Sequence, residues 1–561
     1  MQIYNTKTKL KISILAILAL LITACGEEST KTTKSENLKQ ETKSTNQTNR
    51  ALNISLSENI PTIDPALVSD VISSRVLNDL FEGLVAEDEN NNPIPGVAES
   101  WDISDDGKVY TFHLRKEAKW SNGEPVTAED FVYSLKRAVT PKTTAVMGVY
   151  LNAIGNAKEI LAGEKSPDTL MVKAIDEKTL EITLAHPQAY FPSVLILATA
   201  QPVYPPAVEQ YGDQWTQPQN IVSNGAYKLN KWVTNGVLSV EKNPYYWDAK
   251  NVKIDQVNFY PITSPSDEYN QFRAGRIDMT YSLPQTTSSE HYQKMYGEQF
   301  KNIKQLGTYF YWMNVKVPGL DKLDVRKALT MTVDRKAITT HVLKMGQTPL
   351  YGIVPDGIQN GIYADIYKTL PSYDWVNWSV DKRNDEALKL LQKSGYSKDN
   401  PLKLTISYNT FPVHLQIAQV IAQMWQKAFD GVVKVSLHNE EWKVYLQTLN
   451  KADFEVARQG WRADYNTASN FVSLYICGSS SNRGQFCNEE LDKYYYQGLG
   501  ATTLQEYDEN MKKAIMVAMD NYYTLPVYND SYFRLVSKDI GGYNPTGNYL
   551  DHVYSKWFYF K

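Results

Sequence analysis

Cysteine and histidine are both scarce in this sequence, which has three cysteines and seven histidines among its 561 residues. The histidines are scattered and no CxxC pair occurs, so the usual ligand patterns of a metal centre are missing. His438 and Glu441 have a spacing that suits a metal pair, but they lie in or just after a strand-like segment, where side chains three residues apart point to opposite faces. We therefore expect no metal site.

Enzyme signatures are also absent. The sequence contains no GxSxG elbow, no HExxH pair, no GxxxxGK(S/T) phosphate loop and no GxGxxG dinucleotide fingerprint. An envelope peptidase would need a nucleophile with a base, or a metal set, and the sequence offers neither. An interaction module such as an adhesin is the other class that we weighed against a binding protein. We expect a protein that is not an enzyme and that uses no cofactor.

The sequence has no excess of one charge sign either. Lys and Arg number 58 against 62 Asp and Glu, for a formal charge of -4, and no long basic block occurs, so a nucleic acid is not an expected partner. No apolar run of the body suggests a membrane span. What the chain does have is tyrosine, 38 residues, whose ring and hydroxyl suit ligand recognition as well as core packing.

The N-terminus has the pattern of a secretory signal. Lys7, Lys9 and Lys11 precede an apolar run at 12–22 that is too short to span a bilayer. The run ends in LITACG at 21–26, which resembles the lipobox of bacterial lipoproteins and makes Cys25 the expected acylation site; an ordinary signal peptide with an incidental cysteine is the alternative. We expect a signal peptide at 1–24 and a lipidated, polar tether at 25–50.

The two remaining cysteines, Cys477 and Cys487, bracket a loop rich in glycine and serine. In an oxidising envelope compartment such a pair is expected to form one disulfide. Two reduced structural thiols are the alternative.

The body alternates short strands with helices. Strand patterns occur at 52–56, 109–114 and 180–184, and helical patterns at 325–342, 383–393, 414–429 and 489–520. Thr127 and Asp130 have the spacing of a capping box at the start of another helix. This interleaving predicts an α/β protein with mixed sheets covered by helices.

Several stretches resemble a known family. AESW at 98–101 is followed by YTFHLR at 110–115 and by AKWSNGEPVTAEDFVYS at 118–134. Further matches in the same order are NGAYKL at 224–229, NPYYWD at 243–248, VRKAL at 325–329, DR at 334–335 and GWRADYN at 460–466. Together they resemble the extracytoplasmic solute-binding proteins of family 5, and within these the oligopeptide-binding members that serve peptide ABC transporters.

The resemblance implies the two-lobed periplasmic-binding-protein fold of class II, with mixed sheets, a hinge of two crossovers near 306 and 530, and an extra domain inserted in the first lobe. Lobe I would comprise 51–81, 207–306 and 531–561. The extra domain of lobe I would be 82–206, and lobe II 307–530.

It also implies a peptide-binding site. Asp464 falls where the family binds the peptide's α-ammonium, and Arg458 and His414 fall where it meets the carboxylates of peptides of different lengths. Main-chain pairing with the ligand is implied for Ser69, Asp70 and Val71 on one side and Gly460, Trp461 and Arg462 on the other. Trp442 and Trp461 would be walls of side-chain pockets.

The implied function is that of a monomeric, lipid-anchored receptor in the periplasm or on the cell-envelope exterior. It would bind short peptides of about 2–5 residues and deliver them to an inner-membrane ABC permease with its ATPase subunits, while the N-terminal lipid contacts the membrane. A murein tripeptide, a glutathione-like peptide or a signalling peptide is the alternative cargo.

Four positions depart from the family's pattern. Gly307 and Arg462 stand where relatives have a disulfide, Leu343 where they have a lysine, and Met147 where they have a tyrosine. These departures leave the preferred peptide length, the preferred side chains and the role of Arg462 open.

Overall fold

The computed structural model describes residues 50–284, 286–358, 373–479 and 481–561, with Trp442 and Lys443 described by their backbone alone. The expected signal peptide, Cys25 and all of the tether except Arg50 lie outside the described residues. Within those ranges no helix has both the length and the apolar character needed to cross a membrane.

The first lobe is built on a four-stranded sheet with the order β1-β10-β9-β8. Its strands are β1 (Leu52–Leu56), β8 (Tyr227–Trp232), β9 (Leu238–Lys242) and β10 (Gln256–Pro261). β1 is parallel to β10, and the other neighbours are antiparallel. Helix α1 (Val71–Leu80) begins at Asp70, whose carboxylate accepts a hydrogen bond from the Ser73 N–H at 2.8 Å and so satisfies a free helix amide.

The extra domain contains a second four-stranded sheet with the order β4-β5-β7-β6. Its strands are β4 (Ala98–Ile103), β5 (Val109–Leu114), β6 (Val172–Asp176) and β7 (Thr179–Thr183), and helix α2 (Ala128–Val139) packs on β6 and β7. Alternate residues of β5 are buried, as period-two patterning requires. The expected capping box at Thr127 and Asp130 is confirmed, since each side chain accepts from the backbone amide of the other residue.

The second lobe is built on a six-stranded sheet with the order β12-β16-β11-β15-β13-β14. Its strands are β11 (Phe300–Met313), β12 (Thr348–Pro349), β13 (Leu402–Asn409), β14 (Val433–Glu440), β15 (Val456–Arg462) and β16 (Thr524–Leu535). Its longer helices are α8 (Leu323–Met331), α11 (Val380–Lys393), α12 (Pro412–Phe429), α13 (Trp442–Lys451), α15 (Glu489–Leu499) and α16 (Leu504–Asp520). The expected α/β class is confirmed.

Two of the expected helices are interrupted. The helix expected at 325–342 ends at Met331. A new helical segment begins at Arg335, after the N-cap residue Asp334, whose side chain accepts a hydrogen bond from the Ala337 amide. The helix expected at 489–520 is divided into α15 and α16, because Thr503 caps a new helix by accepting from the Glu506 amide. In both places a side-chain cap outweighs a continuous helical pattern.

Shorter elements complete the fold. They are β2 (Val85–Glu87), β3 (Pro93–Pro95), α3 (Ala157–Leu161), α4 (Phe191–Val194), α5 (Pro205–Tyr211), α6 (Pro265–Arg273), α7 (Ser289–Tyr296), α9 (Arg335–Ala337), α14 (Ser469–Val472), β17 (Ile540–Gly541) and β18 (Tyr559–Phe560).

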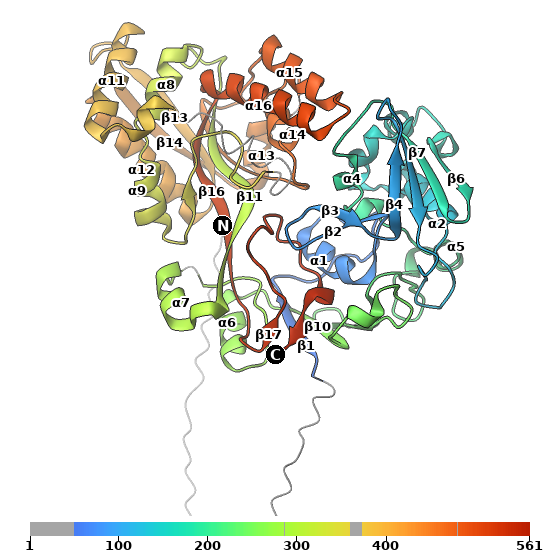
Figure 1. Ribbon diagram of the computed structural model, residues 1–561. Helices are drawn as coiled ribbons and strands as arrows, with labels where there is room; N and C mark the ends of the chain where they lie inside the picture. The colour runs from blue at the N-terminus through green and yellow to red at the C-terminus, as the bar shows by residue number, and fades with distance from the viewer. Residues whose placement is uncertain (1–49, 285, 359–372, 480) are drawn as a thin grey trace, which may run out of the picture. The chain divides into compact units, whose positions relative to one another are not determined.

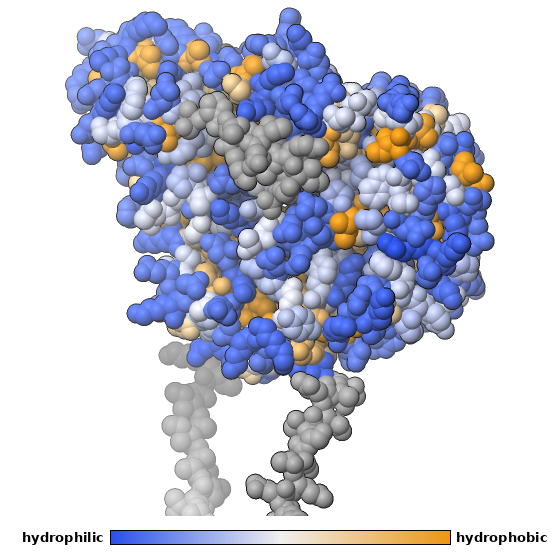
Figure 2. All heavy atoms as spheres, in the orientation of Figure 1, coloured by the Kyte–Doolittle hydropathy of each residue, from blue (hydrophilic) through white to orange (hydrophobic). Residues whose placement is uncertain are grey.

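β11 and β16 are long antiparallel strands that run from one lobe into the other (Figure 1). Their ladder is interrupted between the pair Lys304–Ser531 and the pair Thr308–Asn529. Three residues of β11 therefore face one residue of β16, Asp530, at this point. The surface in the view of Figure 2 is mainly hydrophilic, with apolar residues scattered over it.

Candidate functional site

Two adjoining cavities lie along β15 and the residues that follow it. The first has a volume of about 240 Å³ and the second of about 1040 Å³, and both are lined by Arg462 and Tyr532. The first cavity is bounded by 69–71, just before and at the start of α1, by Met147 and by 462–464. The second is bounded by His414 and by 458–462. The cavities thus follow one stretch of backbone from Asp464 back to Arg458.

Among the described strands, none pairs with one edge of β15 beside the second cavity, so this edge is open. β15 pairs with β11 along its whole length, from Arg462 to Val456, but it pairs with β13 only at Val456 and Ala457. The Ala463 N–H donates to the Leu306 carbonyl at 2.9 Å, and antiparallel pairs alternate, so Gly460 and Arg462 direct their N–H and C=O groups away from β11. An extended ligand could pair with these two residues as an added strand.

Asp464 lies at the first-cavity end of this edge. Its carboxylate accepts a hydrogen bond from the Tyr150 hydroxyl, and burial raises the pKa of the carboxyl. No carboxylate–cation contact within 4.0 Å involves Asp464 among the residues that the structure describes. A partly buried carboxylate beside a cavity is suited to bind a cation. Sequence reasoning missed Tyr150, because no pattern links it to a residue 314 positions away.

Ser69, Asp70 and Val71 line the first cavity opposite Asp464. The Asp70 carboxylate is used as the cap of α1, and the Asp70 carbonyl accepts from the Ser74 hydroxyl at 2.9 Å. Val71 is 66% exposed. This segment therefore borders the cavity while its charged side chain is already engaged in the helix cap.

Arg458 lies at the other end of the edge. Its guanidinium donates to the Asn409 side-chain oxygen at 3.0 Å and lies 4.8 Å from the centre of the Tyr309 ring. The Arg458 carbonyl accepts from the Tyr445 hydroxyl at 2.6 Å, which fixes the strand here. Within the described residues Arg458 has no carboxylate partner, so its charge is available to an anion in the cavity.

His414 lies in the first turn of α12 and is 8% exposed. Its Nδ1 is 3.2 Å from the Tyr309 hydroxyl, and burial together with the charge of Arg458 lowers the pKa of the imidazole to about 3. His414 is therefore neutral at physiological pH. It lines the second cavity as a hydrogen-bonding group and not as a cation.

Arg462 does not present a free charge to either cavity. Its guanidinium binds the Asp530 carboxylate at 2.5 and 2.9 Å and the Tyr532 hydroxyl. Gly460 and Trp461 border the second cavity, and the Trp461 Nε1 is buried with no hydrogen-bond partner in the described part of the chain. Trp442 begins α13, but its side chain lies outside the described part of the chain.

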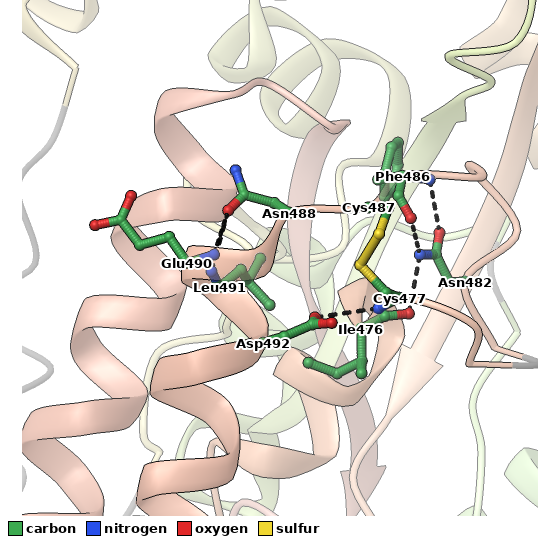
Figure 3. Close-up of a disulfide and its surroundings, with 9 residues drawn as sticks. All are labelled: Ile476, Cys477, Asn482, Phe486, Cys487, Asn488, Glu490, Leu491 and Asp492. Carbon is green, nitrogen blue, oxygen red and sulfur yellow. Dashed lines mark hydrogen bonds between the residues drawn. A yellow bond between two sulfur atoms is a disulfide. The ribbon is translucent and has the colours of Figure 1, made fainter.

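The expected disulfide between Cys477 and Cys487 is present, with Cα atoms 4.6 Å apart (Figure 3). Its loop carries Arg483, a third arginine that lines the second cavity. Sequence reasoning read this loop only as a disulfide framework and so missed Arg483. Across the described residues no group of three potential metal ligands occurs.

Two lobes joined by long strands, with ligand-sized cavities along an open strand edge, define an extracytoplasmic solute-binding protein. The chain belongs to the bacterial extracellular solute-binding protein family 5, since the family model described as "Bacterial extracellular solute-binding proteins, family 5 Middle" matches residues 92–483.

Named relatives agree with this membership. The chain is 39% identical over 503 residues to the periplasmic oligopeptide-binding protein OppA of Salmonella typhimurium. The matched region covers 89% of this chain and 90% of that OppA. The periplasmic murein tripeptide-binding protein MppA in its unliganded open form superposes with a TM-score of 0.82 at 36% identity, over 91% of this chain and 97% of MppA. OppA of Haemophilus influenzae in complex with the peptide RPPGFSPFR superposes with a TM-score of 0.71 at 36% identity. The superposition covers 91% of this chain and 98% of that OppA chain.

Proposed function

We propose that this protein is the substrate-binding lipoprotein of an ABC importer and that it captures short oligopeptides of about 2–5 residues by their termini and backbone. The observation that carries the proposal is the open edge of β15, with a carboxylate at one end, Asp464, and an arginine at the other, Arg458. The named relatives, which bind oligopeptides or a murein tripeptide, support it.

In this proposal the peptide's α-ammonium binds Asp464 and its backbone pairs with Gly460 and Arg462. An extended peptide advances about 3.3 Å per residue, so peptides of different lengths place their carboxylates at different points of the second cavity. Arg458 binds these carboxylates as a cation, whereas neutral His414 donates a hydrogen bond. The second cavity, of about 1040 Å³, has room for side chains of different size together with water.

The proposal also divides the chain into two lobes and an extra domain. Lobe I comprises 51–81, 207–306 and 531–561, with the extra domain at 82–206, and lobe II comprises 307–530. The interruption of the β11–β16 ladder lies at the crossovers near 306 and 530, which supports a hinge there. The receptor is monomeric, is anchored to a membrane through acylated Cys25, and delivers its ligand to an inner-membrane permease with ATPase subunits.

Calorimetry with tri-, tetra- and pentaalanine, each free and N-acetylated, tests the function. We expect the free peptides to bind and acetylation to abolish binding, because the acetylated amine has no positive charge for Asp464. Asp464→Asn should no longer distinguish free from N-acetylated peptides. Asp381→Asn, at an exposed position of α11, should still distinguish them. Equal binding of free and acetylated peptides by the wild type would contradict an ammonium site at Asp464.

A specialised cargo, such as a murein tripeptide, is the second candidate, and the similarity to MppA favours it. Native mass spectrometry of protein purified without unfolding separates the two. One retained peptide of defined mass indicates a specialised receptor, and a series of peptide masses indicates a general one.

A further inference from the structure

We propose that Arg483 makes the second cavity selective for peptides with an acidic side chain in one of their last two residues. The proposal rests on the proposed function, because it assumes that a peptide lies along β15 with its carboxylate toward Arg458. It adds a specificity residue to that site and a chemical class of ligand.

The charges that line the second cavity are unbalanced. Among the residues that the structure describes, three arginines line it, Arg458, Arg462 and Arg483, but the lining includes a single carboxylate, Asp530. Asp530 is already bound to Arg462. In the described ranges neither Arg458 nor Arg483 has a carboxylate within 4.0 Å. Two arginines therefore remain to be neutralised by a ligand.

One carboxylate group carries a single negative charge and cannot neutralise both Arg458 and Arg483. The peptide's terminal carboxylate satisfies Arg458, which lies on β15 itself. A second carboxylate, from a glutamate or aspartate side chain, is the group that matches Arg483, since guanidinium and carboxylate form short, charge-assisted hydrogen bonds. A lysine or arginine side chain would meet uncompensated positive charge in the same place.

The contacts of Arg483 leave it open to such a ligand. Its Nη1 donates to the Gln459 side-chain oxygen at 3.3 Å, and that oxygen also accepts from the Trp312 indole at 2.6 Å. The Arg483 Nε is buried and has no hydrogen-bond partner among the described residues. A partly buried guanidinium that has only a shared, neutral acceptor gains strongly from an anion. Gln459 lies between Arg458 and Gly460 on β15, but its side chain points to the opposite face of the strand, so this contact places Arg483 at the carboxylate end of the site on the face opposite Arg458.

The loop that carries Arg483 is held on both sides. The Asn482 amide donates to the Ile476 and Phe486 carbonyls at 3.1 and 2.8 Å, next to the disulfide (Figure 3). The Gly484 carbonyl accepts from the Val315 amide at 3.1 Å, and the Phe486 ring stacks on Tyr523 with centroids 4.2 Å apart. A residue held between two fixed neighbours can act in selection, because little conformational entropy is lost when it binds.

The test compares isosteric peptides that differ only in charge. Ala-Ala-Glu-Ala is titrated against Ala-Ala-Gln-Ala, and Ala-Ala-Ala-Glu against Ala-Ala-Ala-Gln, by calorimetry at physiological salt. We expect the wild type to bind one glutamate peptide about tenfold more tightly than its glutamine partner. Arg483→Gln should bring this ratio close to one while glutamine peptides still bind, and Arg483→Lys should restore part of it.

Arg276→Gln is the matched control, because it removes an exposed arginine that does not line the second cavity and should leave the ratio unchanged. An equal ratio in wild type and Arg483→Gln would overturn the proposal. So would an equal loss of both peptides in Arg483→Gln, since it would assign Arg483 to the terminal carboxylate or to loop structure. Failure of the wild type to bind any peptide is a different result and would contradict the proposed function instead.

Discussion

Arg462 and Asp530 form an ion pair across Gly307, on the two strands that flank β11. Gly307 allows this approach, because a Cβ atom there would lie 3.0 Å from the Asp530 Cβ and 3.1 Å from the Arg462 Cγ. Both side chains therefore lie over one backbone position, at the interruption of the β11–β16 ladder. The pair connects two strands at the proposed hinge.

The ion pair should contribute a measurable but small coupling energy. The Arg462 side chain is 50% exposed, so water and salt screen the attraction. We expect Asp530→Asn and Arg462→Gln each to lower the free energy of unfolding, with a coupling of about 0.5–1 kcal/mol in a double-mutant cycle. Urea unfolding of the two single variants and the double variant measures it, and strictly additive effects would show that the contact contributes nothing.

Asp464 is expected to destabilise the empty protein. Because burial raises the pKa of its carboxyl, the folded state holds a proton where the unfolded chain has lost it, so stability falls as pH rises through that raised pKa. At pH 7 Asp464→Asn should therefore raise the unfolding temperature of the ligand-free protein. The same change should weaken peptide binding by about 3–5 kcal/mol, because the ligand's ammonium is left without its carboxylate.

Calorimetric melting with and without peptide tests both halves of this expectation. The wild type should melt at a higher temperature with peptide, and Asp464→Asn should melt at one temperature in both conditions. An Asp464→Asn protein that is less stable than the wild type when empty would indicate that the hydrogen bond from Tyr150 outweighs the cost of burial.

His414 should make the fold sensitive to acid. Its pKa is lowered from 6.5 to about 3, so between these values the unfolded chain binds a proton that the folded protein does not, and stability is lost as pH falls below 6.5. His414→Gln should remove about 2 kcal/mol of the loss that occurs between pH 7 and pH 5. Urea unfolding at both pH values measures this.

His438→Gln is the control for His414, because that side chain is 55% exposed. It should lose as much stability between the two pH values as the wild type. If His414→Gln also behaves like the wild type, the imidazole of His414 is not held neutral by burial.

The fold was predictable wherever a local pattern decides it. The helix at 414–429 was expected with nearly its observed bounds, because its apolar spacing acts within a few residues, although the observed helix begins two residues earlier, at Pro412. The prediction of one continuous helix at 489–520 was wrong. The cap at Thr503 is also a local signal, but it competes with the helical pattern and starts a new helix.

The contacts within the site were not predictable in this way. Arg462 and Asp530 are 68 residues apart and meet only because β11 lies between their strands. Tyr150 contacts Asp464 from 314 positions away in the sequence. Even the neutrality of His414 depends on burial in the tertiary fold and on the charge of Arg458, which comes from β15. Sequence reasoning located the backbone of the site through its motifs, but side-chain partners depend on tertiary packing.

Acylation of Cys25 is a prediction that concerns the segment outside the described residues. Mass spectrometry of protein extracted from membranes should find a diacylglyceryl-modified Cys25 as the first residue. Cys25→Ser should move the protein from the membrane fraction to the soluble fraction without changing peptide affinity. An unmodified N-terminus at another position would contradict the lipobox interpretation.

The disulfide is expected to contribute both to stability and to selection. It closes a loop with a sequence separation of 10, which corresponds to about 2–3 kcal/mol in the chain-entropy treatment. The double variant Cys477→Ser, Cys487→Ser should lose about that much in urea unfolding. Labelling of unreduced, denatured wild type should detect no free thiol at these positions.

Since the same loop carries Arg483, the variant without the disulfide should also lose most of its preference for glutamate over glutamine peptides while it still binds the glutamine peptides. A variant with lowered stability and an intact preference would show that Asn482 and Phe486 hold Arg483 in place without the disulfide.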